Sequence, residues 1–252
     1  MKIGLQLYTL RDELSKDFIS TLRKVADIGY QGLEFAGYGG LQPEELKDVL
    51  EQLNIKSLGS HVSIDRLKHA LDEEININRF IGSEYVVCPG LPLEMRNSLD
   101  AIKETALLFT EYGMKFAEHG IQFCYHNHSF EFEEKIADEL LFDRLMNAAS
   151  EKFMGIELDV CWVYNAGYDP LIYLKEYNGR IPLLHVKDII HAGTKAAETV
   201  ELGKGEMDLI PILDAAVKNK VQWLIVEQDE CSNPPLECVE TSFKWLKNTI
   251  EQ

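Results

Sequence analysis

Four residues of the types that bind divalent cations each follow a short apolar run. They are His126 in FCYHNHSF, Asp159 in GIELDVCW, His185 in PLLHVKD and Glu227 in WLIVEQDE. Each run is typical of a buried strand, so each candidate ligand stands near the carboxyl end of a different strand. Two imidazoles and two carboxylates suit one divalent metal, such as Mn²⁺, Mg²⁺, Co²⁺ or Zn²⁺. We therefore expect these four side chains to form a metal site at one end of a sheet.

The elements that must position these residues alternate between strand and helix along the whole chain. Strands are expected at residues 2–8, 32–37, 57–63, 84–90, 121–128, 154–160, 181–189 and 221–228. Helices are expected at 16–28, from Pro43, at 64–80, 97–119 and 136–149, from Asp169-Pro170, and at 208–219 and 236–250. Eight such units in about 250 residues predict an α/β fold with one (β/α)8 TIM barrel domain over residues 1–252. An open doubly wound sheet would favour a glycine-rich loop after the first strand, and TLRDEL has no glycine.

The composition restricts the classes of partner. The formal net charge is −17, and no cluster of basic residues interrupts it, so a nucleic-acid partner is not expected. No apolar run reaches the roughly 20 residues that span a bilayer, and the amino terminus does not resemble a secretory signal. The odd number of cysteines, without a CxxC motif, indicates reduced thiols. Together these features predict a cytoplasmic enzyme with no membrane partner.

Two residues are expected to be catalytic. Glu227 follows the largely apolar VQWLIV, where a merely solvated charge is not expected. One oxygen of Glu227 could bind the metal while the other accepts a proton. Lys187 stands two residues after His185, on the same side of a regular strand, where an ammonium could offset negative charge that develops on a substrate. A solvated surface lysine is the alternative interpretation.

Five more residues are expected to contact the substrate. Glu157 stands two residues before Asp159, and neighbouring carboxylates need a cation, a proton or an arginine between them. Glu157 could alternatively hold a metal-binding imidazole in place. Trp162 could offer a flat apolar wall to a ring, and it could equally pack beneath a loop. The five residues, each with a structural role as the alternative, are Glu34, His61, His128, Glu157 and Trp162.

The segment LGKGEMD, residues 202–208, has two glycines just before an expected helix. A lone GxG is weak as a sign of phosphate binding. We interpret this segment as a mobile rim of the pocket.

Seven segments together resemble the sugar phosphate isomerase/epimerase family, also called the xylose-isomerase-like TIM barrel superfamily. They are LQLYTLRDEL, GYQGLEFAG, GSHVS, YHNHSFEF, ELDVCW, LLHVKDI and LGKGEMDL, and they cover nearly the whole chain. The resemblance implies a (β/α)8 barrel, one divalent cation and a small carbohydrate substrate. Relatives are often homodimers or homotetramers, and the sequence leaves that choice open.

The resemblance also implies roles for single residues. Ketose 3-epimerases of this superfamily hold their metal through Glu, Asp, His and Glu on strands five to eight. The last three correspond to Asp159, His185 and Glu227, whereas the first glutamate falls on His126. Those epimerases use both glutamates as acid and base, so His126 counts against a symmetric two-glutamate mechanism. Trp162 replaces a histidine that assists substrate binding in those epimerases.

We therefore expect a metal-dependent isomerase or epimerase that converts a small keto-sugar or keto-glycoside through an enediolate. Loss of a β-substituent from the same enediolate would instead make the protein a lyase or dehydratase of a keto-inositol or keto-glycoside. Hydrolysis of DNA, as in endonuclease IV, would need about three metals and a basic groove, which a charge of −17 opposes. A non-catalytic sugar-binding barrel is the remaining alternative.

Overall fold

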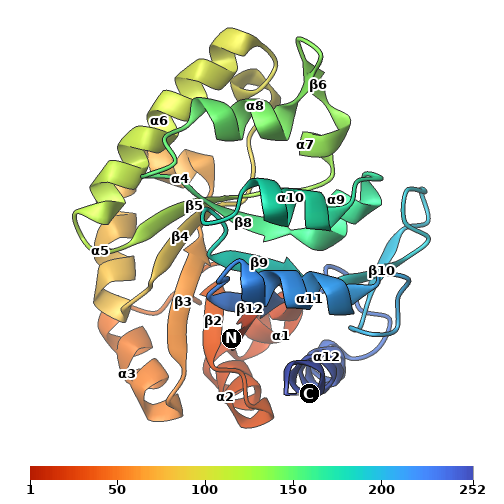
Figure 1. Cartoon of the computed structure of the whole chain (residues 1–252). Coiled ribbons are helices and arrows are strands. Elements are labelled where there is room, and N and C mark those ends of the chain that lie inside the picture. Colours follow the sequence, from red (N-terminus) through yellow and green to blue (C-terminus); the bar gives the residue numbers. More distant parts are fainter. Residues whose placement is uncertain (252) are drawn as a thin grey trace.

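The computed structural model describes residues 1–251, and these contain a closed barrel of eight parallel strands (Figure 1). The strands follow one another around the barrel in chain order, and the last pairs with the first. They are β1 (Lys2–Gln6), β2 (Gly32–Phe35), β3 (Lys56–His61), β4 (Tyr85–Cys88), β5 (Gln122–His126), β8 (Gly155–Asp159), β9 (Leu183–Val186) and β12 (Trp223–Val226). The expected TIM barrel is thus confirmed. The expected domain ends at Gln252, which lies outside the described residues.

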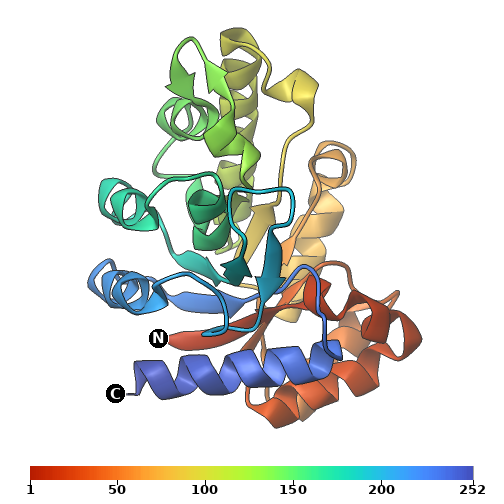
Figure 2. The same cartoon turned by 90° about the vertical axis from the view of Figure 1, so that its right-hand side faces the viewer.

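Helices cover the outside of the barrel (Figures 1 and 2). The longer ones are α2 (Phe18–Ile28), α3 (Pro43–Leu53), α5 (Leu71–Ile81), α6 (Leu99–Ala117), α8 (Leu141–Ala148), α10 (Pro170–Glu176), α11 (Leu209–Lys218) and α12 (Pro235–Ile250). Shorter helices are η1 (Leu7–Leu10), α1 (Arg11–Lys16), α4 (Ile64–His69), η2 (Leu93–Met95), α7 (Phe130–Glu133) and α9 (Val160–Asn165). None of the helices in residues 1–251 has the length and apolar composition that crossing a bilayer requires.

An apolar plug fills the amino end of the barrel. Its largest member is Trp223, and a Cβ atom at Gly32 would lie 2.7 Å from the Trp223 ring. Glycine is therefore needed where the indole packs against β2. The other members are Leu58, Tyr85, Val87, Cys124, Leu183 and Ile225. Because this end is closed by apolar side chains, the ionisable residues are confined to the carboxyl half, as barrel enzymes require.

Three expected elements differ from the observed ones. The helix expected at 64–80 is two helices, α4 and α5, separated by Ala70 with φ −143°. The helix expected at 136–149 begins only at Leu141, because Ala137 and Asp138 take positive φ in a hairpin of β6 (Lys135–Ile136) and β7 (Glu139–Leu140). The strand expected at 181–189 is interrupted at Lys187. After this interruption, β10 (Asp188–Ile190) pairs antiparallel with β11 (Glu198–Val200).

All eight barrel strands end one to three residues earlier than expected, and after two of them a polar side chain caps the next helix. Gln6 Oε1 accepts a hydrogen bond from the Tyr8 amide at 3.0 Å and starts η1. Asp159 Oδ1 accepts from the amides of Cys161 and Trp162 at 3.0 and 3.1 Å and starts α9. This cap fixes the Asp159 side chain and leaves its Oδ2 for other contacts.

Candidate metal centre

The four predicted metal ligands meet at the carboxyl ends of four adjacent strands. His126, Asp159, His185 and Glu227 come from β5, β8, β9 and the residue after β12. One ligand atom from each lies within 4.8 Å of the others, and all four residues are buried. The structure therefore brings the predicted set together, whereas metal binding itself stays a prediction.

The distances define which atoms face the centre of this group, called the upper cluster below (His126, Asp159, His185 and Glu227). His185 Nδ1 is 3.0 Å from Glu227 Oε2 and 3.9 Å from Asp159 Oδ2. His126 Nε2 is also 3.9 Å from Asp159 Oδ2. Asp159 Oδ2 is buried and accepts no hydrogen bond within the described residues. Two imidazole nitrogens thus face a carboxylate oxygen with unused capacity.

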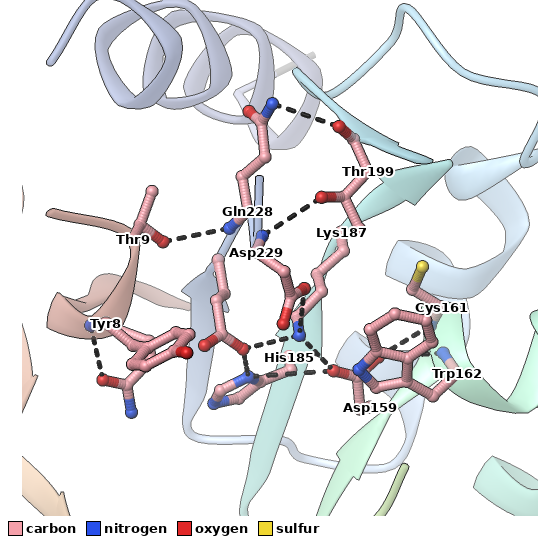
Figure 3. Close-up of polar contacts among 12 residues, drawn as sticks. Tyr8, Thr9, Asp159, Cys161, Trp162, His185, Lys187, Thr199, Gln228 and Asp229 are labelled. Carbon is pink, nitrogen blue, oxygen red and sulfur yellow. Dashed lines mark hydrogen bonds and ion pairs between the residues drawn. The ribbon is translucent and has the colours of Figure 1, made fainter. Parts of the chain in front are cut away.

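Lys187 places a buried ammonium on the same carboxylates (Figure 3). Its Nζ lies 2.6 Å from Glu227 Oε2 and 3.0 Å from Asp159 Oδ2, and both contacts are ion pairs. It also donates to Asp229 Oδ2 at 2.9 Å and lies 5.1 Å from the centre of the Trp162 ring. Burial alone would lower the pKa of Lys187, but the three carboxylates outweigh it and hold that pKa well above its usual value.

Asp229 is not among the site residues expected from the sequence, although it contacts Lys187. A signal was present, because Asp229 stands two residues after Glu227, as Lys187 does after His185. That spacing puts side chains on the same side of an extended segment. The alternative interpretation of Lys187 as a solvated surface lysine is wrong, because its side chain is 1% exposed.

Two buried glutamates, Glu34 and Glu157, lie on the side of the His126 and His185 rings opposite Asp159 and Glu227. Together with His61 they form the lower cluster (Glu34, Glu157 and His61). Glu157 Oε2 is 2.9 Å from His126 Nδ1 and 2.7 Å from His61 Nε2. Glu34 Oε2 is 2.7 Å from His185 Nε2 and accepts from Gln6 Nε2 at 2.9 Å. The role of Glu157 in holding an imidazole, left open from the sequence, agrees with these contacts. Both glutamates are fully buried, so their expected contact with substrate stays a prediction.

These contacts indicate which ring nitrogen of His126 and of His185 carries a proton and which one is free to bind a metal. A carboxylate accepts a proton donor, so Glu157 favours N–H at His126 Nδ1 and Glu34 favours N–H at His185 Nε2. His126 Nε2 and His185 Nδ1 are then free to ligate in the upper cluster. His61, His126, Glu157 and His185 also lie within 4.8 Å of one another. Their contacts of 2.7 to 3.2 Å are hydrogen-bond lengths, as is the 3.0 Å contact of His185 with Glu227, so contact length does not separate the two groups.

The imidazoles differ in charge. Burial lowers the pKa of His126 well below its usual value, and the nearby His185 lowers it further. Burial also opposes the charged form of His61, but Glu34 and Glu157 outweigh it and raise that pKa to about 10. The same two glutamates hold the pKa of His185 well above its usual range. His126 is therefore neutral, and the two others are positively charged in the absence of a metal.

His128 and Trp162 stand at the edge of the upper cluster. The His128 ring centre is 4.9 Å from that of His126 and 6.4 Å from that of Trp162. His128 Nδ1 and Trp162 Nε1 are buried and lack hydrogen-bond partners within residues 1–251. Burial lowers the pKa of His128 to about 4, with Lys187 as the next contribution, so the ring is neutral. Both groups have free capacity to bind a polar ligand.

The loop at 202–208 is tied down by Asp188, which the sequence interpretation missed. Asp188 Oδ2 accepts from the amides of Gly203 and Gly205 at 2.9 Å each, and its Oδ1 accepts from the Met207 amide at 3.2 Å. A Cβ at Gly205 would lie 2.1 Å from Asp188 Oδ1, which explains the glycine. The backbone donors that could cradle a phosphate are thus already occupied by this carboxylate.

Comparisons with known proteins agree with this architecture. An inosose dehydratase of Geobacillus kaustophilus (strain HTA426) is 24% identical over 96% of this chain and 89% of its own length. A sugar phosphate isomerase/epimerase from Parabacteroides distasonis ATCC 8503 superposes with a TM-score of 0.83 at 25% identity, covering 98% of this chain and 93% of that one. The IOLI protein, solved with a bound zinc atom, superposes with a TM-score of 0.78 at 17% identity. The match covers 100% of this chain and 98% of that one, and it shows a shared fold.

The family match includes the strands that supply the clusters. A model of the xylose isomerase-like TIM barrel family matches residues 22–249, from α2 to α12. The matched region contains seven of the eight barrel strands, since only β1 precedes it. Both the closed parallel barrel and this match lead to one conclusion: the chain belongs to the xylose isomerase-like TIM barrel family.

Proposed function

We propose that this protein is a divalent-metal-dependent isomerase or epimerase of a small keto-sugar or keto-glycoside. The observation that carries the proposal is the upper cluster, in which four buried ligand atoms lie within 4.8 Å of one another. Members of the family act as isomerases, epimerases and dehydratases, and the names of the relatives include an epimerase and a dehydratase. The family agrees with this general chemistry but does not select one reaction.

The donor set fits a divalent cation. His126 is neutral, with its Nε2 free, and Asp159 Oδ2 is buried without a hydrogen bond. Formally, five carboxylates face three positive groups (Lys187, His61 and His185), an excess of two negative charges that the raised pKa of Glu157 and of Asp229, both caused by burial, reduces. Uncompensated buried charge is costly, and a bound dication offsets it. The five carboxylates are Glu34, Glu157, Asp159, Glu227 and Asp229.

When bound, a divalent cation would polarise the carbonyl of the substrate and acidify the neighbouring C–H. Glu227 is the base in this proposal. Its Oε2 contacts Lys187 and His185, whereas no hydrogen bond from the described residues reaches its Oε1. Burial would raise the pKa of Glu227, but Lys187 and then His185 outweigh it and hold that pKa well below its usual value. Glu227 is therefore ionised, and it becomes a stronger base only when its contact with Lys187 weakens.

Lys187 links proton removal to stabilisation of the enediolate. As negative charge develops on the substrate oxygen, the ammonium gains a further anionic partner beside its three carboxylates. A weaker contact with Glu227 at that moment makes the carboxylate a stronger base. Asp229 keeps the ammonium in place throughout, because its Oδ2 is 2.9 Å away.

A dehydratase or lyase on a keto-inositol or keto-glycoside is the second candidate, and His126 is the observation that favours it. The neutral imidazole stands where a two-glutamate epimerase would carry its other acid/base group. Elimination needs one base and a route for the leaving group, which Glu227 with Lys187 or His128 can provide. The relative named inosose dehydratase is compatible with this alternative.

Two measurements test the proposal. Elemental analysis should find about one divalent metal per chain, and no metal after reconstitution would favour a non-catalytic sugar-binding barrel. In D2O, a keto-sugar substrate should gain deuterium at the carbon next to the carbonyl. Glu227→Gln should abolish this exchange, whereas Glu118→Gln on an exposed helix end should not. Full exchange in Glu227→Gln would refute the assignment of the base.

A further inference from the structure

The segment that carries Glu227 and Asp229 lies beyond the end of a barrel strand. Strand β12 ends at Val226, and its pairing with β1 and β9 ends at the same residue. The position of both carboxylates therefore depends on the contacts that hold the segment after the strand. The proposed function requires that position, because Glu227 Oε2 and Asp229 Oδ2 lie 2.6 and 2.9 Å from Lys187 Nζ.

Two threonine hydroxyls accept the next three backbone amides (Figure 3). Thr9 Oγ1, in η1, accepts from the Gln228 amide at 3.0 Å. Thr199 Oγ1, in β11, accepts from the amides of Asp229 and Glu230 at 3.1 and 3.3 Å. The two threonines are 3% and 4% exposed, so both hydroxyls are enclosed by protein.

Thr199 makes the larger set of contacts with this segment. Its hydroxyl also donates to the Glu230 carbonyl at 3.4 Å, and its own carbonyl accepts from Gln228 Nε2 at 3.2 Å. The same Nε2 donates to the Glu230 carbonyl at 2.9 Å and closes the turn. One threonine thus contacts residues 228, 229 and 230.

The hairpin of β10 and β11 connects the two sides of the ion pair. Strand β10 begins at Asp188, directly after Lys187, and its partner β11 places Thr199 opposite Ile189. Lys187 is thus joined to the hairpin through the chain, and Asp229 is joined to it through the Thr199 hydroxyl. The register of the hairpin therefore helps to set the distance between the ammonium and its carboxylate partners.

The hydroxyl is the part of Thr199 that this role requires. Valine has the shape of threonine without the acceptor, so Thr199→Val would leave the amides of Asp229 and Glu230 without their partner. Because an amide that loses its acceptor is destabilising, the segment would move toward other acceptors, including water. A shift of about 1 Å in a reacting group can slow a reaction roughly 100-fold.

We propose that Thr199 is a positioning residue for the upper cluster. Its hydroxyl fixes the backbone of residues 228–230 so that Glu227 and Asp229 meet Lys187. The inference rests on the proposed function for the roles of Glu227 and Lys187. It goes beyond that function, because it makes the geometry of the base depend on a hairpin residue that belongs to neither cluster.

Three variants test the proposal: Thr199→Val, the rescue variant Thr199→Ser and the matched control Thr21→Val. Thr21 is also buried, at 2% exposed, and its hydroxyl donates to the Asp17 carbonyl at 2.7 Å. Mn²⁺ affinity is measured by competition with a chromogenic chelator. Deuterium exchange into 3-keto-glucose is then followed at saturating Mn²⁺.

Thr199→Val should lower Mn²⁺ affinity about tenfold and kcat about 10- to 100-fold, with KM unchanged. Thr199→Ser keeps the hydroxyl, so it should match the wild type, and Thr21→Val should match it as well. Wild-type affinity and kcat in Thr199→Val would overturn the proposal. So would a Thr199→Ser variant that is as impaired as Thr199→Val.

A measurement without metal or substrate separates this inference from the proposed reaction. Lys187 is 1% exposed, so its acetylation by an N-hydroxysuccinimide ester, read by mass spectrometry, reports how often its surroundings open. Maleimide labelling of Cys124, buried at the amino end of the barrel, reports opening of the whole fold. Thr199→Val should speed acetylation of Lys187 about tenfold, with Cys124 labelling unchanged and Thr199→Ser equal to the wild type.

Unchanged acetylation of Lys187 in Thr199→Val would overturn the positioning role. Equal acceleration at Lys187 and Cys124 would also overturn it, because Thr199 would then stabilise only the fold as a whole. Faster acetylation of Lys187 alone, in a protein that neither binds Mn²⁺ nor exchanges deuterium, supports the positioning role and counts against the proposed reaction.

Discussion

Lys187→Met is expected to bind a divalent metal more tightly and yet lose turnover. The variant keeps the length of the side chain and removes the ammonium. In the structure, that ammonium lies 2.6 Å from Glu227 Oε2 and 3.0 Å from Asp159 Oδ2, the oxygens that we assign to the metal. The lysine and the cation therefore compete for two oxygens.

The magnitude follows from those two contacts. A close buried charge pair has a coupling energy of about 1.5 kcal/mol or more, so releasing two shared oxygens corresponds to about 3 kcal/mol or more. Since 1.4 kcal/mol is a factor of ten, full release would strengthen metal binding about 100-fold. The ammonium also pairs with Asp229, which weakens its hold on the two shared oxygens. We therefore expect metal affinity to rise about 10- to 100-fold. Loss of a donor to developing negative charge should slow deuterium exchange about 10²- to 10³-fold.

The assay is competition for Mn²⁺ with a chromogenic chelator, followed by exchange at saturating metal. Lys2→Met is the matched control, because Lys2 contacts Glu84 at 3.5 Å at the amino end of the barrel. Weaker or unchanged metal binding in Lys187→Met would refute the competition. Tighter binding with undiminished exchange would refute the role of Lys187 in the reaction.

Three further changes test the surroundings of the clusters. Glu157→Gln removes the carboxylate 2.9 Å from His126 Nδ1, so metal affinity should fall about 10- to 100-fold in the same chelator assay, and an unchanged affinity would contradict the role of Glu157. Burial raises the pKa of Glu131 to about 8, so the fold favours its protonated form. Stability should therefore be greatest below about pH 4.5 and fall by about 4 kcal/mol up to pH 8. Glu131→Gln should lose this decline in urea unfolding measured at pH 5.5 and 8.5, and an identical slope in both proteins would contradict it. Asp188→Ala leaves the amides of the 202–208 loop without their acceptor, so limited proteolysis should cleave this loop faster, with cleavage elsewhere as the internal control.

The convergence of the four candidate ligands could be predicted because strand periodicity and barrel closure carry most of the information. His126, Asp159, His185 and Glu227 each follow an apolar run, and parallel strands of a closed barrel bring their carboxyl ends to one mouth. The elements at the barrel mouth were less predictable. The hairpin after β9 and the end of β8 depend on local hydrogen bonds, such as the Asp159 cap, that no periodicity encodes.

The depth of each site residue along the barrel axis could be predicted only in part. Residues two apart on a strand share a side, so Glu157 and Asp159, or His185 and Lys187, must lie at two depths. Which carboxylate meets which imidazole depends on the stagger between strands, and the sequence does not reveal it. In the structure, β8 pairs with β9 so that Asp159 is level with His185, and β5 pairs with β8 so that His126 is level with Glu157.

This stagger explains why the imidazoles lie between two sets of carboxylates. Glu34 and Glu157 contact one nitrogen each of His185 and His126, and the remaining nitrogens face Asp159 and Glu227. The deeper glutamates can therefore orient the imidazoles without competing for the cation. A one-residue change of register between β8 and β9 would put Glu157 and Asp159 on the wrong side of the strand relative to His185. The chemistry proposed for this barrel thus depends on strand register as much as on the identity of the ligands.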